Sequence, residues 1–130
     1  MRIEEAFAKV ETPAYVVSED LIRKNLQILH DVEEQSGAHI LLAQKAFSMY
    51  SLYPLIGEYI SGATASGINE ARLGYEYMGK ENHIFAPAYK ENEFDEIVKI
   101  CDHIIFNSYN QFAKYKDSVK KAGISCGIRV

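Results

Sequence analysis

The residue best suited to covalent chemistry in this sequence is a lysine at the end of a short apolar run. Lys45 closes the run 39–45, HILLAQK, which lies between Gly37 and the serines Ser48 and Ser51. A run of this length and composition is typical of a buried strand in a parallel sheet. An ammonium group at the carboxyl end of such a strand is expected to be partly desolvated, which favours the free amine that attacks aldehydes. The pattern indicates a candidate Schiff-base lysine, and its alternative is a solvated charge that reaches the surface.

The rest of the sequence alternates between short apolar runs and helical patterns. Strands are predicted at 14–17, 39–44, 63–65, 83–86, 103–106 and 125–130, and helices at 18–37, 51–60, 67–78, 94–101 and 108–123. The helix that begins at Ser18 carries an apolar face of Leu21, Ile22, Leu26, Leu29 and Val32. Ser108 and Gln111 have the spacing of a capping box, and Gly123 ends that helix.

A strand followed by a helix recurs at a nearly constant period. Comparable strand positions at 39, 63, 83, 103 and 125 follow one another at steps of 24, 20, 20 and 22 residues. Such a repeat closes either as a doubly wound open sheet or as an eight-stranded barrel. No Gly-x-Gly-x-x-Gly or P-loop motif follows a strand, which removes the main sign of a nucleotide-binding open sheet. A barrel needs about 250 residues. We therefore expect an α/β fold that is the N-terminal half of a (β/α)8 TIM-type barrel, incomplete in this chain.

Composition excludes several classes of function. The 130 residues carry a formal net charge of -4, so no basic surface for nucleic acid is expected. No apolar stretch approaches the length of a membrane span, and the start of the chain has no signal-peptide core, so we expect one cytoplasmic domain with no membrane contact. Cys101 and Cys126 have no paired spacing and are expected to be buried, reduced thiols.

Four segments together resemble a known family. They are 12–15 (TPAY), 41–45 (LLAQK), 66–74 (SGINEARLG) and 105–108 (IFNS), in this order. They resemble the carboxynorspermidine (carboxyspermidine) decarboxylases, which are similar to the alanine racemase-like, fold-type III pyridoxal-phosphate enzymes. The resemblance implies a barrel with a β domain that follows it, a homodimer in the full-length form and a role in polyamine biosynthesis. It also implies that Lys45 holds pyridoxal 5'-phosphate and that the substrate is a small carboxy-polyamine.

The resemblance leaves alternatives open. Many decarboxylases of the wider superfamily have Ala-Asn after the lysine and Asp at the position of Thr64, whereas this chain has Ala46 and Phe47 after Lys45. These differences favour a carboxy-polyamine over ornithine, arginine or diaminopimelate. A related amino-acid decarboxylase, a non-catalytic pyridoxal-phosphate-binding barrel protein and an interaction role for the half-barrel are the competing hypotheses.

Further cofactor-binding residues are expected at the carboxyl ends of the strands, where barrel enzymes place their chemistry. Arg129 resembles the arginine that faces the phenolic oxygen of the cofactor in related enzymes, and its alternative is an exposed residue near the end of the chain. Thr64, Ser66 and Glu70 are weaker candidates, and a first-turn glutamate such as Glu70 also stabilises its own helix.

Two other groups of side chains recur near strand ends. The aromatic residues Phe47, Tyr50, Tyr53, Phe85, Tyr89 and Phe106 are expected mainly as core filling, with a polyamine pocket as the alternative. His39, His83 and His103 begin strands and share the amino-terminal end of the sheet. No carboxylate at ligand spacing accompanies them in the sequence, so no metal site is predicted.

Overall fold

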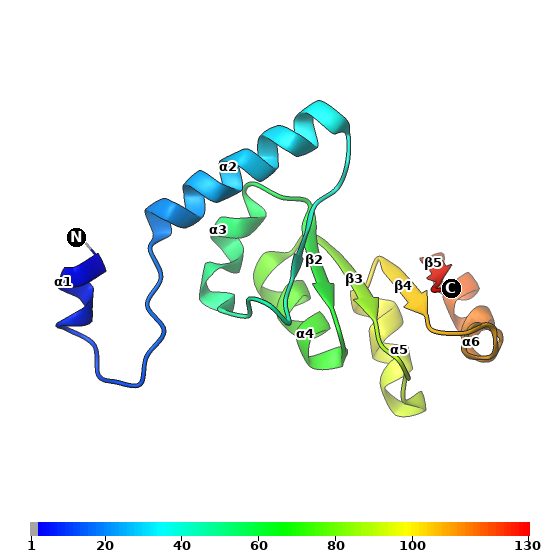
Figure 1. Cartoon of the computed structure of the whole chain (residues 1–130). Helices are drawn as coiled ribbons and strands as arrows, with labels where there is room; N and C mark the ends of the chain where they lie inside the picture. The colour runs from blue at the N-terminus through cyan, green and yellow to red at the C-terminus, as the bar shows by residue number, and fades with distance from the viewer. Residues whose placement is uncertain (1–2) are drawn as a thin grey trace.

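A five-stranded parallel sheet forms the centre of the structure, a computed structural model that describes residues 3–130 (Figure 1). The strands are β1 (Leu41–Ala43), β2 (Gly62–Ala65), β3 (Glu81–Phe85), β4 (His103–Phe106) and β5 (Ser125–Ile128). Their order in the sheet is β1-β2-β3-β4-β5, and every neighbouring pair is parallel. Parallel neighbours need a crossover connection, and each connection here is helical. The predicted α/β class and the five repeat strands are confirmed.

The helices precede the sheet or connect its strands. They are α1 (Ile3–Phe7), α2 (Glu19–Ser36), η1 (Tyr50–Leu52), α3 (Tyr53–Gly57), α4 (Ile68–Leu73), η2 (Gly74–Met78), α5 (Glu91–Ile100) and α6 (Tyr109–Ala122). The predicted caps of α6 are confirmed: Ser108 Oγ accepts from the Gln111 amide at 3.2 Å, and Gly123 ends the helix at a φ of 70°. A positive φ of this size favours glycine because it lacks a side chain.

The strand predicted at 14–17 is wrong. These residues have no regular structure, and Tyr15 is 95% exposed. Figure 1 shows α1 and the segment after it extending away from the sheet, so among residues 3–130 no strand pairs with residues 14–17. The short helix α1 was not predicted. Met1 and Arg2, which belong to the segment searched for a signal peptide, lie outside the described residues.

Two predicted helices differ in kind from the expectation. The segment 51–60 forms the 3₁₀ turn η1 followed by α3, with Pro54 in the first turn of α3. The segment 67–78 forms α4 and then a π-helical turn, η2. Here the chain lies very close to the strands, because a Cβ added at Gly74 would lie 2.8 Å from Asn82 Oδ1. The sequence gives no local pattern for this change of helix type.

The helices cover one face of the sheet. In β3 and β4 the buried residues are Asn82, Ile84, Ile104 and Phe106, which alternate with partly exposed ones. Because alternate residues of a strand point to opposite faces, Glu81, His83 and Phe85 lie together on the other face. The register places His83 beside His103 and Thr64 beside His83 on that face. We call it the open face of the sheet.

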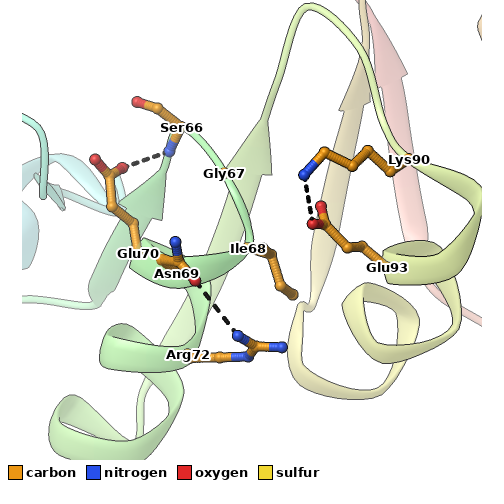
Figure 2. A pocket seen from close by; sticks show the side chains of 8 residues that line it. All are labelled: Ser66, Gly67, Ile68, Asn69, Glu70, Arg72, Lys90 and Glu93. Atoms are coloured by element: carbon orange, nitrogen blue, oxygen red, sulfur yellow. Dashed lines mark hydrogen bonds and ion pairs between the residues drawn. The ribbon is translucent and has the colours of Figure 1, made fainter.

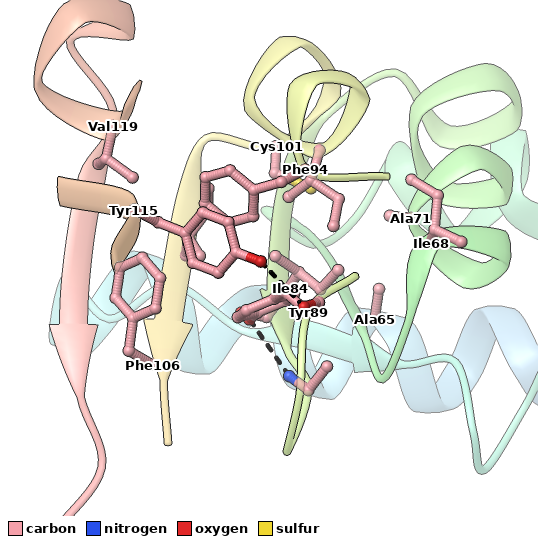
Figure 3. Packing of buried hydrophobic residues seen from close by; sticks show 13 residues of the cluster. Ala65, Ile68, Ala71, Ile84, Tyr89, Phe94, Cys101, Phe106, Tyr115 and Val119 are labelled. Carbon is pink, nitrogen blue, oxygen red and sulfur yellow. Dashed lines mark hydrogen bonds between the residues drawn. The ribbon is translucent and has the colours of Figure 1, made fainter. Parts of the chain in front are cut away.

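The buried side chains form two clusters. The larger one, between β2–β4 and the helices α4–α6, contains Phe94 and Tyr115, whose stacked rings are 3.9 Å apart between centroids (Figure 3). The smaller cluster consists of Leu26, Tyr53, Leu55, Ile56, Ile60, Ala63 and Met78. We call them the large core and the small core.

The apolar face predicted for α2 is only partly buried. Leu26 is buried, whereas Leu21 and Val32 are 57% and 47% exposed. The helix meets the small core mainly through Leu26, with Ile22 packed at its margin. The amphipathic spacing predicted the helix correctly. It did not predict how much of the apolar face of α2 is buried by the rest of residues 3–130. Within residues 3–130, no helix has the length and apolar character needed to cross a membrane.

Candidate functional site

The turn that carries Lys45 begins where β1 ends. The amides of Ala46 and Phe47 both donate to the carbonyl oxygen of Ala43, at 2.9 and 3.2 Å, which closes the turn. The Gln44 amide donates to Thr64 O at 3.2 Å and links the turn to β2. Lys45 therefore lies at the carboxyl end of β1, as predicted. Its side chain is exposed, however, and the expected desolvation is wrong, because the turn leaves the apolar strand before the lysine and projects it into solvent.

Ser66 and Glu70 lie together in the connection between β2 and α4. The Ser66 amide donates to Glu70 Oε2 at 2.5 Å (Figure 2). A carboxylate in this position satisfies a backbone N–H group before the first turn of α4 and complements the helix dipole. Glu70 thus fixes the Ser66 turn, and Thr64, which is half-buried, lies one strand away from Lys45 through the register pair Ala43–Thr64.

A shallow polar hollow of about 400 Å³ opens beside this turn (Figure 2). It is lined by Ser66, Gly67, Ile68, Asn69, Glu70, Arg72, Lys90 and Glu93. Its cations are paired within the chain: Arg72 donates to both oxygens of Glu96, at 2.6 and 2.7 Å, and Lys90 donates to Glu93 at 2.9 Å. Lys45 does not line this hollow, so the predicted residues Ser66 and Glu70 share it without the lysine.

A second hollow, of about 470 Å³, lies next to the Lys45 turn. It is lined by Tyr15, Val17, Ala46, Phe47, Ser48 and Met49. Among the six aromatic candidates, Phe47 therefore borders a hollow beside the lysine. Tyr53, Tyr89 and Phe106 are buried in the cores, as the main expectation had it.

Arg129 follows the end of β5 and contacts Phe85. The Arg129 amide donates to Phe106 O at 2.9 Å, and the guanidinium carbon lies 5.0 Å from the centroid of the Phe85 ring. This distance is within the range of a cation–π interaction. Arg129 is exposed, as its alternative predicted, and this contact places its positive charge at the carboxyl ends of β3 and β5. Lys45 follows β1, which lies at the opposite edge of the sheet, so Arg129 and Lys45 are not brought into contact.

Two of the three histidines at the amino-terminal end of the strands share a carboxylate, which corrects the sequence interpretation. Glu81 accepts from His39 Nδ1 at 2.6 Å and lies 3.2 Å from His83 Nε2. The His83 and His103 ring centroids are 5.1 Å apart, and burial, with the neighbouring His83 charge, lowers the pKa of His103. Glu81 was missed because β3 begins two residues earlier than predicted. No three His, Cys, Asp or Glu side chains of residues 3–130 are arranged to hold a metal ion.

The cysteines also differ from the expectation in part. Cys101 is buried, and burial, with the nearby charge of Asp102, raises the pKa of its thiol to about 12. Cys126 is exposed on β5, the edge strand. Both are free thiols.

No protein-family model matches the chain, but curated proteins do. It is 44% identical over 124 residues to the carboxynorspermidine/carboxyspermidine decarboxylase of Campylobacter jejuni subsp. jejuni, a match that covers 94% of this chain and 32% of the relative. It is 40% identical over 106 residues to the enzyme of the same name from Herminiimonas arsenicoxydans, covering 82% of the chain and 29% of the relative. A carboxyaminopropylagmatine decarboxylase of Synechocystis is 32% identical over 123 residues, covering 95% and 32%.

A solved structure agrees with these relatives. The crystal structure of carboxynorspermidine decarboxylase from Campylobacter jejuni, complexed with norspermidine, superposes with a TM-score of 0.86 at 45% identity. The match covers 91% of this chain and 32% of that chain. The resemblance first noted in four segments is confirmed along most of the chain, which spans about a third of the length of its relatives.

Proposed function

We propose that the protein carrying this chain is a pyridoxal-phosphate-dependent decarboxylase acting on carboxynorspermidine or carboxyspermidine in polyamine biosynthesis. The observation that carries the proposal is the identity of 44% over 124 residues with an enzyme of that name. The position of Lys45 supports it, because its side chain is exposed where β1 ends and an aldehyde can reach it.

The sheet is proposed to be part of a (β/α)8 barrel of the alanine racemase-like type. Its strands follow one another in chain order with no reversal, and helices cover one face. A doubly wound sheet would reverse its strand order and carry helices on both faces. In this proposal residues 1–130 are the N-terminal part of the barrel. The full-length protein would supply the remaining barrel strands and the β domain, and two copies of it would form a homodimer.

The side chains present fit the proposed cofactor. An exposed amine, the Thr64 and Ser66 hydroxyl groups and the Arg129 guanidinium all lie at the carboxyl ends of strands. In the proposed site Lys45 would hold pyridoxal phosphate through its aldehyde, and Arg129 would place a fixed positive charge at the oxygen-bearing edge of the ring. When bound, the cofactor supplies an electron sink for the pair of electrons left by departing carbon dioxide.

The other predicted residues would hold the site in place. Glu70 fixes the Ser66 turn through its bond to the Ser66 amide, and the Thr64 carbonyl holds the Lys45 turn through the Gln44 amide. The Lys45 amine, once protonated and released from the cofactor, is suited to return a proton to the substrate carbon that lost carbon dioxide.

A second candidate substrate has support from the comparisons. The Synechocystis relative is named for carboxyaminopropylagmatine, although its identity of 32% is lower than the 44% of the Campylobacter enzyme. Both substrates are carboxylated polyamines, and the net charge of -4 suits a polycation. A protein that binds pyridoxal phosphate without turnover is the non-catalytic alternative.

Trapping the cofactor tests the proposal. The full-length protein is incubated with pyridoxal phosphate and reduced with borohydride, and the labelled peptide is mapped. We expect a phosphopyridoxyl group on Lys45 that is lost in Lys45→Ala together with decarboxylation, whereas Lys24→Ala, at an exposed position on α2, keeps both. A label on another lysine would refute the assignment.

Substrate preference is the second measurement. The ratio kcat/KM is compared for carboxynorspermidine, carboxyspermidine, carboxyaminopropylagmatine, ornithine and diaminopimelate. A carboxy-polyamine is expected to give the highest ratio. A preference for ornithine or diaminopimelate would refute the proposed substrate class, and cofactor binding with no turnover of any of them would favour the non-catalytic alternative.

A further inference from the structure

A buried hydroxyl group spans the turn that carries Lys45. Tyr53, at the start of α3, is fully buried in the small core. Its hydroxyl lies 3.2 Å from Gln44 Oε1 and 3.3 Å from Phe47 O. Gln44 precedes Lys45 directly and Phe47 follows it by two residues, so one hydroxyl contacts both sides of the turn.

The Gln44 side chain is itself fixed by its surroundings. It is fully buried, and a Cβ added at Gly74 would lie 3.0 Å from Gln44 Nε2 and 2.8 Å from Asn82 Oδ1. The two amide groups thus approach the same point of the π-helical turn η2. Asn82 cannot move freely, because its Nδ2 donates to Ala71 O and Ile100 O at 2.8 Å each. Gln44 Oε1 accepts from the Tyr53 hydroxyl, whereas Gln44 Nε2 and Asn82 Oδ1 are buried with no hydrogen-bond partner among residues 3–130.

Backbone bonds also hold this turn, and one of them links the Gln44 amide to Thr64 O at 3.2 Å. Its own backbone bonds run from Ala46 and Phe47 to Ala43 O, and the Lys45 side chain lies in solvent. Phe and an aliphatic residue would fill the space of Tyr53 and Gln44, so hydrophobic packing alone does not require these polar side-chain atoms. The Tyr53 hydroxyl and the Gln44 amide instead restrict residues 44–47 to a single geometry.

We propose that Tyr53 and Gln44 are positioning residues for Lys45, acting through the turn 44–47 rather than by contact with cofactor or substrate. The inference rests on the proposed function, in which Lys45 is the covalent anchor. Burial, and next the charge of Glu70, raises the pKa of the Tyr53 hydroxyl, which therefore stays protonated and able to donate near neutral pH. The positioning acts from the helix side of the sheet, where neither side chain reaches solvent.

Removal of the hydroxyl alone tests this role. Tyr53→Phe keeps the ring in the small core and deletes the donor. Tyr115→Phe is the matched control, because the Tyr115 hydroxyl is also buried and donates to Tyr89 O at 3.0 Å, but in the large core. Gln44→Met is a second variant that removes the amide and keeps the length of the side chain. Circular dichroism and thermal unfolding establish that each variant is folded at the assay temperature.

Two measurements are made on each variant of the full-length protein. Hydrogen exchange at the Ala46 and Phe47 amides reports the turn directly, and the yield of borohydride-trapped phosphopyridoxyl label on Lys45 reports its reactivity. We expect Tyr53→Phe to speed exchange at both amides about tenfold, the factor that corresponds to one buried hydrogen bond, and to lower the label yield by a similar factor. Gln44→Met should act in the same direction, and Tyr115→Phe should change neither.

The outcomes separate this inference from the proposed function. Exchange at Ala46 and Phe47 that is unchanged in Tyr53→Phe would overturn the positioning role even if Lys45 is labelled. An equal loss of label in Tyr53→Phe and Tyr115→Phe would also overturn it, because loss of stability alone would then explain the effect. Absence of label on Lys45 in the unmodified protein would overturn the proposed function. The turn 44–47 would then have no role in positioning a cofactor-binding lysine.

Discussion

Removal of the buried Asn82 side chain is expected to destabilise the fold. Its Nδ2 atom donates to Ala71 O in α4 and to Ile100 O at the end of α5, at 2.8 Å in both cases, from a position that is 1% exposed. One amide group thus fastens two helices to β3. In Asn82→Ala the main-chain bonds with Asp102 persist, so the change isolates the side chain.

The cost follows from what each acceptor retains. Ala71 O still accepts from the Gly74 amide, so its loss is close to one ordinary hydrogen bond, about 1 kcal/mol. Ile100 O has no other hydrogen bond among residues 3–130, but Ile100 is half-buried and water can reach it, so this loss is also about 1 kcal/mol. Asn82 Oδ1 is buried with no partner among residues 3–130, so its removal costs no hydrogen bond, and we expect Asn82→Ala to lower the free energy of unfolding by about 2 kcal/mol.

Urea unfolding followed by circular dichroism measures this change. The midpoint should fall while the slope against urea stays the same, since the surface exposed on unfolding barely changes. Asn107→Ala, at an exposed position, is the control and should shift the free energy by less than about 0.5 kcal/mol. A loss below about 1 kcal/mol in Asn82→Ala would refute the assignment of both helices to this amide.

Two further predictions concern the strands. Burial, with His83 nearby, lowers the pKa of His103 in the folded chain below its ordinary 6.5. As the pH falls through 6.5, His103 is therefore protonated more readily in the unfolded chain, and the free energy of unfolding should decrease. His103→Asn should reduce that loss in urea titrations between about pH 8 and pH 5, and an unchanged pH profile would contradict the prediction. A Cβ at Gly62 would lie 2.0 Å from Glu81 O, a backbone atom that cannot rotate away, so Gly62→Ala should cost about 3 kcal/mol. Gly67→Ala, where nothing lies within 4 Å, should cost far less, and equal unfolding midpoints for the two variants would show that β2 and β3 can separate freely.

Local patterns predicted the repeat elements well. Ser108, Gln111 and Gly123 gave the bounds of α6 because caps act within a few residues. The strand predicted at 14–17 failed because a β-type composition forms a strand only beside a partner, and the structure provides none there. The π-helical turn that begins at Gly74 was not predicted either, and the side chains close to Gly74, those of Gln44 and Asn82, come from distant parts of the sequence.

The candidate site was predictable in position but not in detail. The apolar run placed Lys45 correctly at the carboxyl end of β1, because the strand itself fixes that position. Its exposure depends on the turn after the strand and was not visible in the run. The pair Tyr53–Gln44 and the sharing of Glu81 between two histidines arise from contacts between separate elements, for which spacing in one segment carries no information.

The division of the buried side chains into two cores has a consequence for how the chain opens. Ala63 belongs to the small core and Ala65 to the large core, so the short strand β2 is the boundary between them. The side with α2 buries fewer residues than the side with α4–α6, and parts of a protein with fewer buried contacts open at lower free energy. Partial unfolding should therefore begin at α2 and stop at β2. The Lys45 turn would then loosen while β3–β5 and their helices stay folded.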